Sequence, residues 1–228
     1  MPAKNNKLSL VYKPKYSEAF RRNRPLHLMI ILFIAVFIIL SLKPVDRFEW
    51  WFENITSLIT VILLTVTYNK NRLTGLSYAC VLICLILHAL GAHFTYLNCP
   101  IGNWMKVLFG FRRNNYDRLV GFSFGLLVSF PVMESLYQRL WLRYIHACIL
   151  SGVIILSVCA MFQLYEMYCS MLLTPKHAFI FLGIQSDIWD AQNDIAAGFI
   201  GSVVSMGGCI MFRVKKNHNI HIVRNDNK

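Results

Sequence analysis

Residues 25–42 read PLHLMIILFIAVFIILSL, a run of 18 residues without a charged side chain. An α-helix rises about 1.5 Å per residue, so roughly 20 such residues cross the hydrocarbon core of a bilayer. A basic segment that ends at Arg24 precedes the run, and no small-residue cleavage site separates it from Asp46. The pattern therefore favours a retained transmembrane helix over a cleaved signal peptide.

The rest of the chain continues this pattern. Of the 228 residues, 56% are hydrophobic and only 15% are charged, a composition that excludes an ordinary soluble domain. We predict an all-α, polytopic membrane protein with about six transmembrane helices, at residues 26–43, 51–68, 74–96, 118–138, 144–167 and 194–212. The expected division is a basic N-terminal segment (1–25), a six-helix transmembrane domain (26–212) and a basic tail (213–228).

Lysine and arginine predict the orientation, because basic loops stay in the cytoplasm. With both termini cytoplasmic, the inner segments hold 16 of these residues and the outer segments hold 7. The net charge of +12 is concentrated at the two cytoplasmic ends, which favours membrane lipids with anionic headgroups as partners and not nucleic acid. Aspartate and glutamate show the opposite distribution: 8 of 11 fall on or near the predicted outer side.

Polar side chains gather at the predicted outer end of the third helix, which reads His88-Ala-Leu-Gly-Ala-His93-Phe-Thr-Tyr96. Ionisable groups inside a membrane cost free energy unless partners or water satisfy them. His88 and His93 are about 140° apart around a helix and do not face one ligand together, whereas His93 and Tyr96 are better placed to share a face. His93 is a candidate ligand or proton carrier, and a structural hydrogen bond is the equal alternative.

The outer loop that follows carries arginines against the usual charge bias. It ends in Arg112-Arg113-Asn-Asn-Tyr-Asp117-Arg118, and a guanidinium suits bidentate binding of phosphate or carboxylate. We expect Arg118, with Arg112, to hold an anionic headgroup. An ion pair with Asp117 or with the acids of the last span is the structural alternative. Earlier in the loop, residues 101–109 predict a short amphipathic helix in the membrane interface.

The last span opens on Ser186-Asp187-Ile-Trp-Asp190-Ala-Gln-Asn-Asp194. On a helix, the three aspartates lie within about 60° of one another. Helix capping by Ser186 or Asp187 accounts for one or two acids. Three aspartates on one face of a helix repel one another, which favours a neutralising cation or paired arginines. Because hard cations prefer oxygen ligands, Asp187, Asp190 and Asp194 are candidate ligands for a divalent cation such as Mg²⁺.

Two further sets of residues are expected to serve packing. Small residues follow the acids in the last span, among them Gly198, Gly201, Gly207 and Gly208, and small side chains let membrane helices approach closely. Most of the seven cysteines lie inside apolar runs, where a thiol behaves as a small hydrophobe. Only Cys99 and Cys169 lie where an oxidising compartment reaches them, and a disulfide between these two is left open.

Together these segments resemble the YjdF family of bacterial inner-membrane proteins, whose activity is unknown. The resemblance is carried by residues 88–96, by residues 115–118 with Phe122 and Gly125, and by residues 187–194, and it covers residues 25–212. It implies a multi-pass protein of the inner membrane. The family pattern places a histidine three residues after the Asp-Arg pair, where this chain has Gly121, so a catalytic role for that histidine does not carry over.

A more distant similarity is to the VanZ-like membrane proteins, which share an Asp-Lys/Arg pair that opens one helix and an acid-rich lead into a helix of small residues. This similarity implies action at the cell envelope, by analogy alone.

Three hypotheses of function follow. The first is an envelope protein that binds or modifies an anionic lipid, with His93, Asp117 and Asp190 as candidate catalytic groups and the headgroup and cation ligands named above. The second is a transporter of ions or small solutes, against which the spans show no clear internal repeat. The third is a non-enzymatic scaffold whose ion pairs only join helix ends. Whether the protein is an enzyme is left open.

Overall fold

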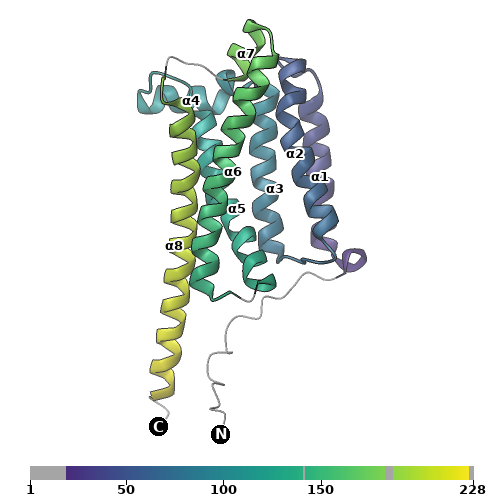
Figure 1. Ribbon diagram of the computed structural model, residues 1–228. Coiled ribbons are helices and arrows are strands. Elements are labelled where there is room, and N and C mark those ends of the chain that lie inside the picture. The colour runs from purple at the N-terminus through teal and green to yellow at the C-terminus, as the bar shows by residue number, and fades with distance from the viewer. Residues whose placement is uncertain (1–18, 141, 183–186, 226–228) are drawn as a thin grey trace.

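The computed structural model describes residues 19–140, 142–182 and 187–225, and within these ranges it describes side chains outside residues 176, 179–180 and 216–225. Six long helices run side by side (Figure 1). They are α1 (Arg24–Ser41), α2 (Arg47–Thr67), α3 (Gly75–Phe94), α5 (Tyr116–Arg139), α6 (Tyr144–Leu172) and α8 (Asp190–Asn225). Each contains a stretch long and apolar enough to cross a membrane, which confirms the six predicted spans.

Short elements mark the two ends of this bundle. At one end lie α4 (Pro100–Phe109) and α7 (Pro175–Phe181), and we call this the α4 end (Figure 1). The opposite end carries the 3-10 turn η1 (Phe20–Arg22) and the last turns of α8, so both ends of the described chain lie on one side of the bundle. The predicted short helix at residues 101–109 is confirmed as α4, whose Trp104, Val107 and Phe109 are exposed.

Side-chain caps fix where the first helices begin. The Asn23 side chain accepts a hydrogen bond from the Leu26 N–H at the start of α1, and the Asp46 side chain accepts from two N–H groups at the start of α2. Thr74 caps α3 in the same way, by accepting from the Ser77 N–H. Such caps satisfy N–H groups that have no partner within the helix.

The closest packing in the bundle is between α5 and α8. A Cβ atom added to Gly125 would lie 1.8 Å from the Gly198 carbonyl oxygen, and one added to Gly201 would lie 2.1 Å from the Phe122 carbonyl oxygen. The two backbones therefore touch, which confirms the predicted packing role of Gly198 and Gly201. The same prediction is wrong for Gly207 and Gly208, because among the described residues no atom lies within 4 Å of a Cβ added there.

The cysteines also pack. All seven lie within the described residues and are free, so Cys99 and Cys169 are not joined in a disulfide. Cys99 is buried, and Cys159 lies against α8, where its sulfur fills the space beside Gly198.

One carboxylate is buried at the end of the bundle away from α4. The sequence places Glu134 near the end of a predicted span, where the membrane interface could solvate a carboxylate. Instead Glu134 is 5% exposed and accepts hydrogen bonds from the Thr74 N–H at 3.0 Å, from the Thr74 and Ser77 hydroxyls and from the Gln138 amide. The carboxylate of α5 thus binds the N-terminus of α3, where the helix dipole also favours negative charge.

Replacing Glu134 with alanine is therefore expected to destabilise the bundle by about 1–3 kcal/mol, because buried donors at the start of α3 lose their acceptor. Thermal unfolding of the purified protein in detergent measures the loss. Glu134→Gln keeps one carbonyl acceptor and should retain part of the stability. Equal unfolding temperatures for wild type and Glu134→Ala would contradict this role.

Candidate functional site

Six charged side chains meet at the α4 end, where α5 and α8 begin. We call them the arginine–aspartate cluster: Arg113, Asp117, Arg118, Asp187, Asp190 and Asp194. Two segments supply them. The first consists of the loop before α5 and the first turn of that helix, and the second consists of the residues before α8 and its first two turns.

Arg113 lies at the centre of the cluster. One terminal nitrogen of its guanidinium donates to Asp117 and the other donates to Asp190 and lies 3.8 Å from the nearer Asp187 oxygen. The side chain is 9% exposed, so protein groups and not water surround most of the guanidinium. Because a guanidinium always carries its charge, the paired carboxylates compensate it within the bundle.

Arg118 is the more accessible of the two arginines. Its Nη2 donates to Asp187 and lies 3.2 Å from Asp190 Oδ1, and its side chain is 28% exposed. The Trp189 N–H and the Arg118 guanidinium both donate to Asp187 and lower the pKa of this carboxyl below its ordinary value of 3.8. A lowered pKa means that the pair contributes fully above about pH 4 and is lost as the pH falls through the lowered value, so it is intact at neutral pH.

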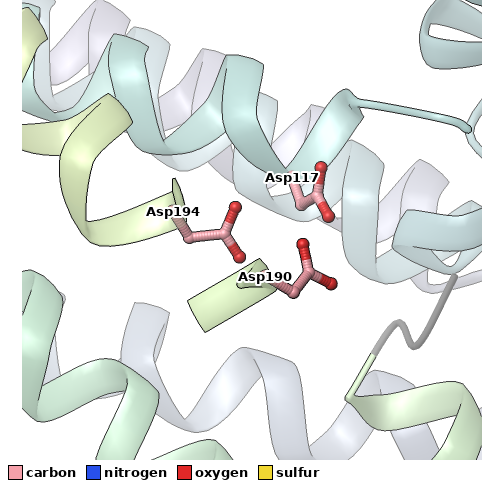
Figure 2. Close-up of side chains that lie close together, drawn as sticks. All are labelled: Asp117, Asp190 and Asp194. Atoms are coloured by element: carbon pink, nitrogen blue, oxygen red, sulfur yellow. The ribbon is translucent and has the colours of Figure 1, made fainter. Parts of the chain in front are cut away.

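Three of the carboxylates face one another, as Figure 2 shows for Asp117 of α5 and for Asp190 and Asp194 of α8. One oxygen of each lies within 4.8 Å of the others, a spacing that allows all three to hold one metal ion. Asp194 Oδ2 lies 3.5 Å from the Gln163 amide nitrogen, while its Oδ1 has no hydrogen-bond partner within the described part of the chain. With four carboxylates and two guanidiniums, the ionised cluster carries a formal excess of two negative charges.

Comparison with known proteins matches residues 25–216 to the family described as "Predicted membrane protein (DUF2238)". The chain belongs to this family. A relative is the "Inner membrane protein YjdF" of Escherichia coli (strain K12), which is 28% identical over 167 residues that cover 71% of this chain and 77% of the relative. These matches confirm the resemblance to the YjdF family. No solved structure matches the chain.

The structure brings most of the residues proposed from sequence in this YjdF-family protein into one place. Asp117, Arg118, Asp187, Asp190 and Asp194 all join the cluster. Arg112 does not, since it is exposed. The neighbouring Arg113, which was not among the predicted site residues, takes the central position. No periodic pattern identifies it, because both arginines precede the first turn of α5.

One detail of the predicted acid motif is wrong. We expected Asp187, Asp190 and Asp194 to line one face of a single helix, but α8 begins at Asp190. Asp187 precedes the helix, where its side chain accepts from the Trp189 N–H at 3.0 Å and from the Asn193 amide at 3.1 Å. Asp187 thus reaches Arg118 from the preceding turn. Ser186, the other predicted cap, lies outside the described residues.

The histidines of α3 point to different helices. His93 Nδ1 lies 2.7 Å from the Leu40 carbonyl oxygen of α1, so the structure joins His93 to α1 and not to the aspartates. His88 Nε2 lies 2.9 Å from the Glu53 carbonyl oxygen of α2. The prediction that the two histidines face apart is confirmed.

Tyr96 does not share a face with His93 as expected, because α3 ends at Phe94 and Thr95 adopts a positive φ of 61°. The chain turns there, and the Tyr96 hydroxyl lies 2.5 Å from His88 Nδ1. Gly91 makes room for this turn, since a Cβ at position 91 would lie 2.6 Å from the Tyr96 ring.

The position where the family pattern has a histidine borders the cluster. A Cβ added to Gly121 would lie 3.5 Å from the Asp194 carbonyl oxygen, an ordinary van der Waals distance. Position 121 therefore faces the start of α8. In this chain position 121 is a glycine and supplies no imidazole to the cluster.

Proposed function

We propose that this multi-pass membrane protein binds the phosphate of an anionic lipid at the arginine–aspartate cluster, through a divalent cation held by Asp117, Asp190 and Asp194. The observation that carries the proposal is the meeting of these three carboxylates from two distant segments, within 4.8 Å of one another. Charge counting supports an outer location for the α4 end, with both termini cytoplasmic.

The donor set suits Mg²⁺. This ion has six ligands and is commonly bound by one or two protein carboxylates together with water and phosphate oxygens. Even if all three aspartates each supply one oxygen, coordination positions remain for phosphate oxygens. The excess negative charge of the cluster favours a cation over a bare anion. Arg118 is the guanidinium placed to donate to a second phosphate oxygen, because it is the more exposed of the two.

Mg²⁺ binding is tested with the purified full-length protein in lipid nanodiscs. We expect Mg²⁺ to raise the unfolding temperature of the wild type, since a ligand at a hundredfold excess over its Kd stabilises the folded state by about 2.7 kcal/mol. Asp194→Asn should abolish this response, because it removes a ligand charge. The matched control is Asp46→Asn, which changes an acid outside the cluster and preserves the α2 cap. A wild type indifferent to Mg²⁺ would refute the cation site.

The lipid part of the proposal has its own test. Lipid profiles and envelope sensitivity are measured in a deletion strain and in a strain that carries Asp190→Ala. The control is each of these strains after complementation with the wild-type gene. A shared change in one class of anionic lipid is expected. Unchanged profiles and unchanged sensitivity in both strains would remove the lipid from the proposal.

A scaffold is the second candidate, favoured by the direct contacts of both guanidiniums with aspartates. In that case the cluster only joins α5 to α8. Exchanging the charges of one pair, with Arg118→Asp and Asp187→Arg together, would then restore the abundance that either change alone lowers. The exchange should not restore a response to Mg²⁺ if the first candidate is correct.

A further inference from the structure

A second set of polar side chains lies inside the bundle on one face of α2. Glu49, Glu53 and Ser57 follow one another at intervals of four residues, so they lie on the same side of the helix. They are only 4%, 2% and 4% exposed. We call them the polar face of α2. It extends from the α4 end over just more than two helical turns, about 12 Å along the helix axis.

Each residue of this face has an oxygen without a hydrogen-bond partner in the part of the chain that the structure describes. Glu49 Oε2, Glu53 Oε2 and Ser57 Oγ form no hydrogen bond with any described residue, and the same holds for Oδ1 of the adjacent Asn54. Among the described residues no lysine or arginine forms an ion pair with either glutamate. In a low-dielectric interior each unsatisfied polar group costs free energy, so a helix that buries four such oxygens implies a ligand between it and its neighbours.

His88 of α3 lies near one of these oxygens, Glu53 Oε2, without satisfying it. Its Nδ1 lies 2.5 Å from the Tyr96 hydroxyl, which has a proton to donate to it. The other nitrogen, Nε2, then carries the imidazole proton and donates to the Glu53 carbonyl oxygen at 2.9 Å. Glu53 Oε2 lies 3.9 Å from the same nitrogen, too far for a hydrogen bond. The neutral imidazole thus has no proton left for the Glu53 carboxylate.

The chemistry of the four atoms identifies the ligand. All four are oxygens that can accept a hydrogen bond or bind a cation, and they belong to two carboxylates, one amide carbonyl and one hydroxyl, which also has a proton to donate. Protonation of Glu53 would not neutralise the second buried carboxylate, Glu49. A hard cation with its water ligands satisfies several oxygens at once and neutralises the carboxylates. We propose that the polar face of α2 is an intramembrane binding site for an alkali or alkaline-earth cation, opposite His88.

The site is separate from the arginine–aspartate cluster but not isolated from it. Glu166 of α6, which is partly buried, lies within electrostatic range of both Glu53 and Asp194. Acidic side chains of α8, α6 and α2 therefore interact with one another near the α4 end. This arrangement lowers the electrostatic barrier to entry of a cation and raises it for an anion.

Dicyclohexylcarbodiimide tests the site, because this apolar reagent modifies protonated carboxyl groups that water does not reach. The purified full-length protein in nanodiscs is treated in a buffer whose only cation is N-methylglucamine, and modification of Glu53 is followed by peptide mass spectrometry. Parallel samples contain Na⁺, Li⁺, Ca²⁺ or Mg²⁺. We expect Glu53 to be modified in the first buffer, and we expect at least one of the four cations to slow this modification.

Two variants sharpen the result. Ser57→Ala should raise the cation concentration needed for half-protection by about tenfold, the usual cost of losing a group that supports a metal site. Thr65→Ala changes an exposed hydroxyl of α2 that bonds only to its own helix, so protection should be unchanged. Asp190→Asn should leave protection of Glu53 in place even if it abolishes the response of the cluster to Mg²⁺.

Two outcomes would overturn the proposal. Equal rates of modification with and without every cation would assign a proton to Glu53, and a Glu53 that resists the reagent in cation-free buffer would show that its carboxylate already has a partner within the protein. Both results are independent of the fate of the cluster.

Discussion

Replacement of Arg113 by alanine is expected to remove most of the folded protein from the membrane. The guanidinium contacts Asp117 and Asp190 directly and is 9% exposed, so its loss leaves two carboxylates facing each other with one cation, Arg118, nearby. Removing one partner of a buried ion pair costs about 3–5 kcal/mol. We expect Arg113→Ala to lose a free energy of unfolding at the lower end of this range, because Asp117 and Asp190 are partly exposed. Membrane abundance and the unfolding temperature in detergent measure the effect.

The neighbouring arginine is a matched control for this prediction. Arg112→Ala removes the same charge one residue earlier, from an exposed side chain outside the cluster. It should change the stability by less than about 0.5 kcal/mol, as surface substitutions usually do. Combining Arg113→Ala with Asp117→Asn and Asp190→Asn should restore part of the lost abundance, because it removes the unpaired charges. Similar losses for the two single arginine variants would contradict the central position of Arg113.

A methyl group at Gly125 is expected to be almost as damaging. The added carbon would lie 1.8 Å from the Gly198 carbonyl oxygen, which is backbone and cannot rotate away, so α5 and α8 must separate. Overpacking of a tight core costs typically about 1–3 kcal/mol and occasionally more. Gly125→Ala should therefore lower the unfolding temperature. If it also weakens the Mg²⁺ response, the register of the two helices positions the cluster.

Gly207→Ala is the control, since among the described residues nothing lies within 4 Å of the added carbon. Alanine favours the helix over glycine by up to about 1 kcal/mol, so this variant should be neutral or slightly stabilised. A Gly125→Ala protein as stable as Gly207→Ala would show that the two helices do not touch.

Most of the fold follows from the sequence because membrane spans carry a strong local signal. An apolar run such as residues 25–42 predicts a transmembrane helix directly, and the amphipathic pattern of residues 101–109 predicts the short helix α4. The ends of the helices are less predictable. Residues 95–96 extend the apolar pattern of α3, yet the positive φ of Thr95 ends the helix and turns Tyr96 back to His88.

The candidate site was predictable only in part. The acids of residues 187–194 and the Asp-Arg pair at 117–118 are visible as motifs, but the choice between Arg112 and Arg113 depends on how a loop enters α5. The polar face of α2 was missed for a different reason. Glu49 and Glu53 resemble the ordinary acids of an interfacial first turn, and only the packing of α2 against α3 shows that they are buried.

The order of the helices along the chain has a consequence for biogenesis. The ribosome synthesises α5, with Arg113 just ahead of it and Arg118 in its first turn, before α6 and α7. Their partners at the start of α8 are synthesised last. Until residue 190 has left the ribosome, the two arginines have no aspartate of α8 to bind, and Gly125 faces no helix. We expect a nascent chain interrupted before α8 to be recognised and degraded. Insertion of the last helix is thus the step that commits the protein to its finished form.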